Sequence, residues 1–315
     1  MSTTLRTPPE ILYHYTDSTG LLGIIGSPLS LPGTEGSPFG FEKGASFGTL
    51  WATDARYLND AHELTFGAAA LAEKLERHAE ESRTPEVIER LRELAATVRD
   101  GRFELTYGTD TERTLPHVTC FCESGDLLSQ WRGYGGGYAI GFDREVFRKF
   151  AVLDTESYER TPDLAMTTLQ EPVHVKYGPT DSDSFLEECA AELAQNLEDV
   201  AAGKKSYEWP NVFRAVCARW LAEVKHGAFE AEAEWRLVHR HTQSRDTHFR
   251  VGGVGLIPYV KLHFPLTLGG RPTITEIVVG PGGERELRRE SLERLLGSIG
   301  SPDTRIRLSD APFRG

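Results

Sequence analysis

Three glutamates near the carboxyl-terminal third of the chain have the type and spacing that chemistry requires. Glu230, Glu232 and Glu234 alternate, and an apolar segment, residues 235–238, follows at once. A carboxylate at the mouth of a strand is held in place by the strand, while the loop beside it stays open to a ligand. Three carboxylates on one strand face would repel, so some of them must face solvent or a cation. We interpret Glu230 as solvated surface.

A second stretch of interest, His14-Tyr15-Thr16, lies near the other end of the chain. One interpretation is a half-buried histidine that the backbone satisfies. The other is an imidazole that hydrogen-bonds a sugar hydroxyl, with an aromatic ring beside it that stacks on a flat heterocycle. The two stretches form one site only if the fold brings His14 and Glu234 to the same crevice.

Other polar and aromatic residues also allow two interpretations. Trp131 is either a core anchor or a ring that stacks on a ligand. Asn59 and Asp60 form either a plain turn or a ligand contact, because such side chains bond their own backbone. Arg236 either pairs with Glu63 or Asp60, or binds a pyrophosphate through two hydrogen bonds.

Several common catalytic and metal sites are excluded by their missing motifs. The chain has no G-x-S-x-G, H-E-x-x-H, Walker loop or G-x-G-x-x-G after a strand. Cys120 and Cys122 have no second pair at zinc spacing, so we expect no metal and reduced thiols of a cytoplasmic protein.

The charge balance limits the partners of this protein. The 315 residues include 35 Lys and Arg and 47 Asp and Glu, which gives a formal net charge of −12. Such a chain is not expected to bind nucleic acid through its whole surface. The first ten residues contain no apolar run, and no stretch approaches 18 apolar residues. We therefore expect neither a secretory signal nor a membrane partner. The oligomeric state stays open.

The elements that must position these residues are short strands and amphipathic helices. Strands are predicted at residues 11–16, 50–53, 118–122, 138–142, 173–177, 235–239, 256–264, 274–279 and 304–308. Helices are predicted at residues 20–25, 64–75, 85–98 with Thr84 as cap, 144–150, 185–200, 213–224 and 287–296. We expect one α+β domain over residues 1–315, with a split mixed β-sheet and helical insertions at about 61–100 and 181–226.

Six blocks of the chain have a characteristic order and spacing. The blocks are Tyr13-His14-Tyr15-Thr16, Leu50-Trp51-Ala52-Thr53 with Leu58-Asn59-Asp60 and Glu63, Thr119-Cys120-Phe121-Cys122 with Asp126, Leu127, Trp131 and Tyr134, Gly137-Tyr138-Ala139-Ile140-Gly141-Phe142, Phe229 with Glu232, Glu234, Trp235 and Arg236, and Ile277-Val278-Val279-Gly280-Pro281. Together these blocks resemble the DUF2971 family of bacterial proteins. The resemblance extends from about residue 11 to about residue 300. The family's pattern is similar to a divergent ADP-ribosyltransferase fold of the sort found in toxin and phage-defence systems.

This resemblance implies an enzyme that takes NAD as substrate and binds it in a cleft between two small sheets. Glu234 matches the catalytic glutamate that bonds the nicotinamide ribose 2′-hydroxyl, and Glu232 is the second choice. The implied NAD-binding residues are His14, Tyr15, Thr16, Asn59, Asp60, Trp131, Tyr134 and Arg236. The chain lacks the Ser-Thr-Ser strand of transferases that carry an E-x-E pair, which puts that subclass in doubt.

Two other functions fit the same residues. The chain could be a non-catalytic nucleotide-sensing or interaction module on the same scaffold. It could also hydrolyse NAD or a related N-glycoside, with water as the acceptor. For a transferase, the acceptor could be a protein, a nucleic acid or a small molecule.

Overall fold

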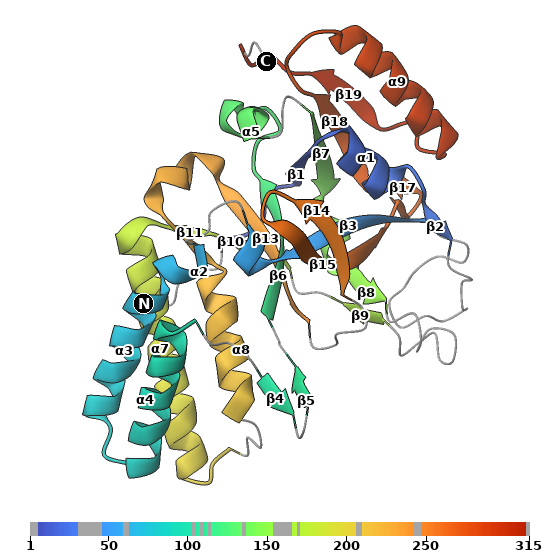
Figure 1. Ribbon diagram of the computed structural model, residues 1–315. Helices are drawn as coiled ribbons and strands as arrows, with labels where there is room; N and C mark the ends of the chain where they lie inside the picture. Colours follow the sequence, from blue (N-terminus) through green and yellow to red (C-terminus); the bar gives the residue numbers. More distant parts are fainter. Residues whose placement is uncertain are drawn as a thin grey trace.

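The protein has a mixed α+β architecture built on one large sheet (Figure 1). The structure is a computed structural model that describes residues 6–30, 46–58, 63–101, 105–107, 110–112, 115–133, 137–153, 166–168, 171–205, 210–241 and 247–312. Across these segments, none of the helices combines the length and apolar character that crossing a membrane requires.

The large sheet contains 13 strands within the described segments. Its main path is β19 (Arg305–Leu308), β18 (Ile274–Val279), β7 (Tyr138–Asp143), β1 (Ile11–Thr16), β6 (Leu115–Cys122), β3 (Ser46–Asp54), β15 (Gly255–Pro265), β8 (Ala151–Leu153) and β9 (Met166–Thr168). The branches off this path are β13 (Glu234–His241), β10 (Val173–His174), β14 (His248–Gly252) and β2 (Leu29–Ser30). The sheet is mixed, because β18 and β19 are parallel while β18 and β7 are antiparallel.

The sheet divides at β6. One end of β6 pairs with β1 through Cys122 and Tyr13, and further along it pairs with β3 through Val118 and Thr53. Strand β13 pairs with β6 along its whole length. Beyond this pairing, Thr119 Oγ1 of β6 donates to the carbonyl of Trp51 of β3 at 3.2 Å.

The larger hydrophobic core lies between the sheet and two helices, α1 (Ser18–Ile25) and α9 (Arg285–Ser298). Asp17 caps α1, because its side chain accepts a hydrogen bond from the amide of Gly20 at 2.7 Å. Phenylalanine rings fill the centre of this core, and the rings of Phe142 and Phe264 lie 5.1 Å apart. The 3-10 helix η2 (Arg144–Lys149) follows β7 and contributes Val146 and Phe147.

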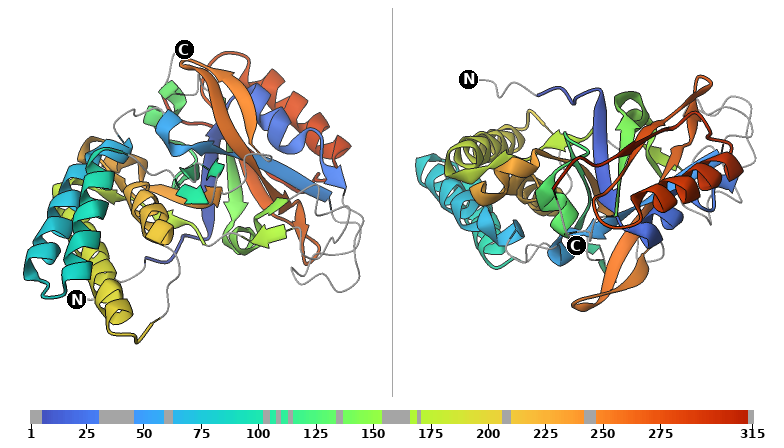
Figure 2. Two further views of the ribbon diagram at one scale, coloured as in Figure 1. Left: turned by 60° about the horizontal axis from the view of Figure 1, so that its bottom comes forward. Right: turned by 90° about the horizontal axis from the view of Figure 1, so that it is seen from above.

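A second core lies within a group of helices beside the sheet (Figures 1 and 2). These helices are α3 (Ala68–Glu81), α4 (Pro85–Arg99), α7 (Gly178–Ala201) and α8 (Pro210–Leu221), with the short α2 (Glu63–Phe66) beside them. Both segments that were predicted as helical insertions therefore contain helices, and their apolar faces pack together. The single-domain interpretation stays a prediction.

Some local details differ from the sequence prediction. Helix α8 ends at Leu221, and Val224 belongs instead to the two-residue strand β12 (Val224–Lys225), which runs parallel to β11 (Lys176–Tyr177). The strand predicted at residues 173–177 is accordingly two short strands in different sheets. The predicted start of α4 is confirmed, with Thr84 at the N-cap position and Pro85 as the first residue, but the Thr84 hydroxyl donates to Glu198 of α7 at 2.8 Å and makes no cap hydrogen bond.

The remaining described elements are short. The strand pairs are β4 (Leu105–Tyr107) with β5 (Asp110–Glu112), and β16 (Thr267–Leu268) with β17 (Arg271–Pro272). The helices are α5 (Leu128–Gly133), η1 (Ala55–Tyr57) and η3 (Gly227–Glu232). Of these, η3 and α5 carry residues of the predicted site.

Candidate functional site

The two candidate glutamates lie at a sharp turn between η3 and β13. Glu232 is the last residue of η3, and β13 begins at Glu234. Ala233 between them has a left-handed backbone with φ of 42°, which costs an L-residue about 1 kcal/mol. The turn brings both carboxylates to one ammonium group, because Lys225 Nζ lies 3.0 Å from Glu232 Oε2 and 2.9 Å from Glu234 Oε2.

Glu234 is enclosed in a network of ions. Arg236 Nε donates to Glu234 Oε1 at 2.7 Å, and Arg236 Nη2 donates to Oε2 at 3.0 Å. Arg236 is fully buried, and only 3% of the Glu234 side chain is exposed. Burial alone would raise the pKa of Glu234, but attraction to Arg236 and Lys225 outweighs it and lowers the pKa to about 2. Glu234 therefore stays ionised at neutral pH.

Glu232 is the more accessible of the two acids. Its side chain is 18% exposed, and its ion pair with Lys225 fixes one carboxylate oxygen. The Lys225 ammonium also lies 4.8 Å from the ring centre of Phe229, which is within range of a cation–π interaction. This arrangement presents a carboxylate at the edge of a buried charge network.

The thiol of Cys122 lies close to these charges but is not activated. Its side chain shares a sheet face with Glu234, because the two residues are directly paired between β6 and β13. Burial raises the pKa of the thiol, and the charges of Glu234 and Glu232 raise it further. Cys122 is therefore a neutral thiol at physiological pH and a poor nucleophile.

His14 lies on the opposite face of the sheet from Glu234. Tyr13 pairs with Cys122, which pairs with Glu234, so these three side chains share one face. His14 follows Tyr13 and points the other way, where its ring lies 5.7 Å from that of Phe121. The structure does not bring His14 and Glu234 together in one crevice, which the sequence interpretation required.

His14 is nevertheless held in one defined state. Its Nδ1 lies 2.9 Å from the carbonyl oxygen of Cys120, which can only accept, so Nδ1 carries the proton. Burial lowers the pKa of His14, and the backbone hydrogen bond opposes this effect less strongly. The neutral ring then presents Nε2 as an acceptor. Thr16, on the same face, is buried, and its hydroxyl occupies the space that a Cβ at Gly20 would need.

Tyr15 and Trp131 pack against each other instead of leaving a ring face open. Their ring centres are 4.7 Å apart in an edge-on arrangement, and Trp131 is fully buried. The Tyr15 hydroxyl donates to the carbonyl of Ser124 at 2.9 Å, and Trp131 Nε1 donates to Asp126 Oδ1 at 2.7 Å. These contacts match the interpretation of Trp131 as a core anchor.

Three residues of the predicted NAD-binding set, Asn59, Asp60 and Tyr134, lie outside the described residues. Two residues that sequence reasoning missed complete the network at Glu234. Lys225 comes from β12, and the hydroxyl of Tyr177 from β11 accepts a hydrogen bond from the Glu234 amide at 2.7 Å. A lysine a few residues ahead of the glutamates was the available signal, but the residues just before it were predicted as a helix end.

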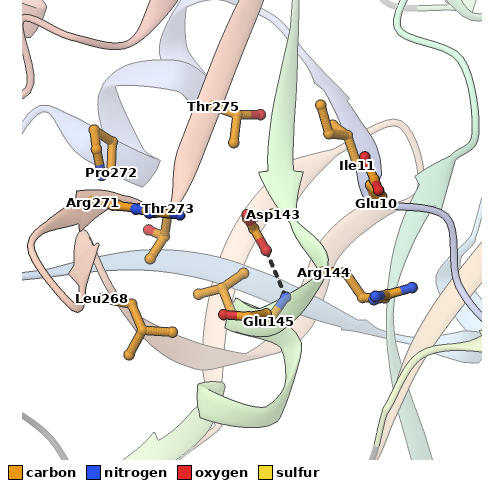
Figure 3. Close-up of a pocket in the computed structure, with 11 residues that line it drawn as sticks. Glu10, Ile11, Asp143, Arg144, Glu145, Leu268, Arg271, Pro272, Thr273 and Thr275 are labelled. Atoms are coloured by element: carbon orange, nitrogen blue, oxygen red, sulfur yellow. Dashed lines mark hydrogen bonds between the residues drawn. The ribbon is translucent and has the colours of Figure 1, made fainter.

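A separate pocket of about 400 Å³ lies where β1 begins and β7 ends (Figure 3). It is lined by Glu10, Ile11, Asp143, Arg144, Glu145, Val146, Leu268, Arg271, Pro272, Thr273 and Thr275. Asp143 is used as a cap there, because its Oδ1 accepts from the amide of Glu145 at 2.8 Å. None of the residues predicted to act on NAD lines this pocket.

Comparison with known proteins supports a family resemblance but indicates no function. Residues 130–237 match the family model described as Protein of unknown function (DUF2971). This DUF2971 segment is about a third of the chain, and it includes Trp131, Glu232, Glu234 and Arg236. No curated protein and no solved structure matches the chain significantly. The match supports the family resemblance over the DUF2971 segment.

Proposed function

We propose that the protein is an NAD-dependent ADP-ribosyltransferase in which Glu232 is the acting carboxylate. The observation that carries this proposal is the unequal exposure of the two acids at the turn: 18% of the Glu232 side chain is exposed, against 3% for Glu234. On this proposal Glu234 is a positioning residue, because it holds the Lys225 ammonium against which Glu232 is fixed.

The proposed reaction breaks the glycosidic bond between nicotinamide and its ribose. The bonding electrons leave with nicotinamide, and positive charge develops at the ribose C1 atom. A carboxylate that accepts a hydrogen bond from the neighbouring 2′-hydroxyl stabilises that charge. A nucleophile on the acceptor then bonds to C1 and loses its proton. Because His14 and Thr16 lie on the other sheet face, neither has a role in this step.

The test is the rate of nicotinamide release from NAD. We expect Glu232→Gln to lower this rate by about a hundredfold, since removing one transition-state contact typically costs that much. The matched control is Glu230→Gln, an exposed glutamate two residues earlier on the same turn. Equal rates for the wild type and Glu232→Gln would refute the catalytic role of Glu232.

The second candidate is a non-catalytic nucleotide-sensing or interaction module. The enclosure of Glu234 between two cations, together with the packed rings of Tyr15 and Trp131, favours it. Calorimetry with NAD and ADP-ribose distinguishes the candidates. Binding without nicotinamide release identifies a sensor, and absence of binding identifies an interaction module. Free ADP-ribose, detected by mass without a modified acceptor, identifies a hydrolase.

A further inference from the structure

A β-hairpin formed by β14 and β15 extends from the sheet (Figures 1 and 2, orange). It exposes apolar side chains. Large hydrophobic side chains are strongly exposed at six described positions, and four of these lie on the hairpin. The four are Phe249 at 60%, Val251 at 85%, Val254 at 75% and Leu256 at 66% exposure. Scattered exposed hydrophobic residues are normal, but a group confined to one element indicates an interaction site.

The two faces of the hairpin differ in chemistry. Phe249 pairs with Pro258 and Val251 pairs with Leu256, so these apolar side chains share one face. His248 and Arg250 of β14 point to the other face. A row of stacked rings holds that face in place, because the Tyr259 ring lies 4.6 Å from that of Trp51 and 5.5 Å from that of His248.

The second face carries two cations, Arg250 and Lys261. Lys261 shares this face with Tyr259, two residues earlier on β15. Arg250 donates to the hydroxyl of Thr53 at 3.4 Å, and within the described segments neither Arg250 nor Lys261 forms an ion pair with a carboxylate. Residues 247–275 contain no Asp or Glu, although the chain has 47 acidic residues. The hairpin is therefore a basic element on an acidic protein.

Strand β14 also has an open pairing edge. Among the described strands it pairs only with β15, at residues 255–259, while β3 pairs with β15 further along, at Tyr259–Pro265. An edge strand presents backbone N–H and C=O groups that can pair with an added strand. Peptides that bind in this way gain affinity from the backbone bonds and specificity from alternate side chains.

We propose that β14 is the docking edge for an extended segment of a partner protein in which apolar and acidic residues alternate. Successive side chains of an added strand point to opposite faces. Its apolar residues would extend the face of Phe249 and Val251, and its acidic residues would lie beside Arg250, with Lys261 on the same face of the neighbouring strand β15. A second copy of this chain fits less well, because antiparallel β14–β14 pairing would bring Arg250 of one copy opposite Arg250 or His248 of the other.

The test uses fluorescent synthetic peptides and the full-length protein. The probe alternates valine and glutamate, and the two controls are a valine–lysine alternation and a peptide with valines and glutamates in separate blocks. We expect the probe to bind at least tenfold more tightly than either control and to slow hydrogen exchange of the amides in β14. Equal affinity for the three peptides, or no slowing in β14, would overturn the proposal.

Two variants test the faces separately. Val251→Asp should weaken probe binding at least tenfold, whereas Leu287→Asp, a matched change at a residue of α9 that is 59% exposed, should leave it unchanged. Arg250→Glu together with Lys261→Glu should reverse the preference to the valine–lysine peptide. The proposal is wrong if Val251→Asp binds normally. It is also wrong if Val251→Asp instead abolishes a homodimer seen by sedimentation, or binding to phosphatidylserine vesicles.

Discussion

Two pairs of cationic side chains in this protein have opposite environments. Lys225 and Arg236 are buried and bound to the carboxylate of Glu234. Arg250 and Lys261 lie on the hairpin, partly exposed and without a carboxylate partner in the described segments. Buried charges must be paired, because the cost of removing them from water is large. Exposed cations are solvated by water and need no carboxylate partner within the protein. They therefore stay available to bind an acidic group of another molecule.

The largest expected effect comes from breaking the buried network. Glu234→Gln removes a carboxylate that offsets both Arg236 and Lys225, and should lower the free energy of unfolding by about 3–5 kcal/mol. Urea denaturation measures this loss. Glu230→Gln, an exposed change on the same turn, should alter the free energy by less than about 0.5 kcal/mol. A loss below about 1 kcal/mol for Glu234→Gln would mean that the network contributes little.

The next effect concerns pH and the buried end of β15. Burial lowers the pKa of His263 to about 4, and the charges of Lys261 and His248 add to this. As the pH falls, the histidine of the unfolded chain binds a proton near pH 6.5, whereas His263 of the folded protein binds one only near pH 4. The free energy of unfolding therefore falls as the pH drops from about 6.5 to about 4. The lowered pKa of His263 corresponds to a loss of about 3 kcal/mol in the free energy of unfolding.

The check is the free energy of unfolding at several pH values for wild type and His263→Gln. The variant should be less stable at pH 7, where it loses the contact between the ring and Thr49 Oγ1. The difference in the free energy of unfolding between wild type and variant should be smaller at pH 4.5, because only the wild type has His263 and loses stability as that pH is approached. A deficit that stays constant over this range would contradict the assignment.

A smaller effect is expected for Glu232→Gln. Its side chain is partly exposed to solvent, and Lys225 retains Glu234, so the loss of stability should be about 1 kcal/mol or less. Thermal unfolding measures it under the conditions of the nicotinamide assay. A folded Glu232→Gln protein is required if lost activity is to be attributed to chemistry. A loss as large as that of Glu234→Gln would make the two acids structurally equivalent.

The smallest effect on stability is expected on the hairpin. Val251 is 85% exposed, so Val251→Asp should change the free energy of unfolding by no more than about 0.5 kcal/mol. The same variant is expected to lose peptide binding, which separates recognition from folding. A large loss of stability by urea denaturation would show that the exposed face supports the fold.

Local apolar patterns were enough to predict many elements from the sequence. The strands at Ile11–Thr16 and Ile274–Val279 have the bounds that were predicted, because each is a compact apolar or aromatic run. Strand β14 was missed. Its exposed Phe249 and Val251 alternate with Arg250 and precede two glycines, so it lacks the inward-facing apolar pattern of a core strand.

The site was harder to predict than the fold, because it depends on how strands align. Alternation within a strand shows that His14 and Tyr13 face opposite ways, but not which of them faces Glu234. That relation depends on the register that pairs Tyr13 with Cys122 and Cys122 with Glu234. A shift of one residue in either pairing would reverse it. Single-sequence reasoning contains no information about such a shift.

The position of β6 between β1, β3 and β13 has a consequence for synthesis in the cell. Its partners β1 and β3 precede it, but β13 is translated roughly one hundred residues later. At about 5–20 residues per second on the ribosome, one side of β6 waits several seconds for its partner. During that time it is open to pairing with other nascent chains. We therefore expect chaperones to raise the yield of folded protein mainly by acting on the nascent chain before β13 leaves the ribosome.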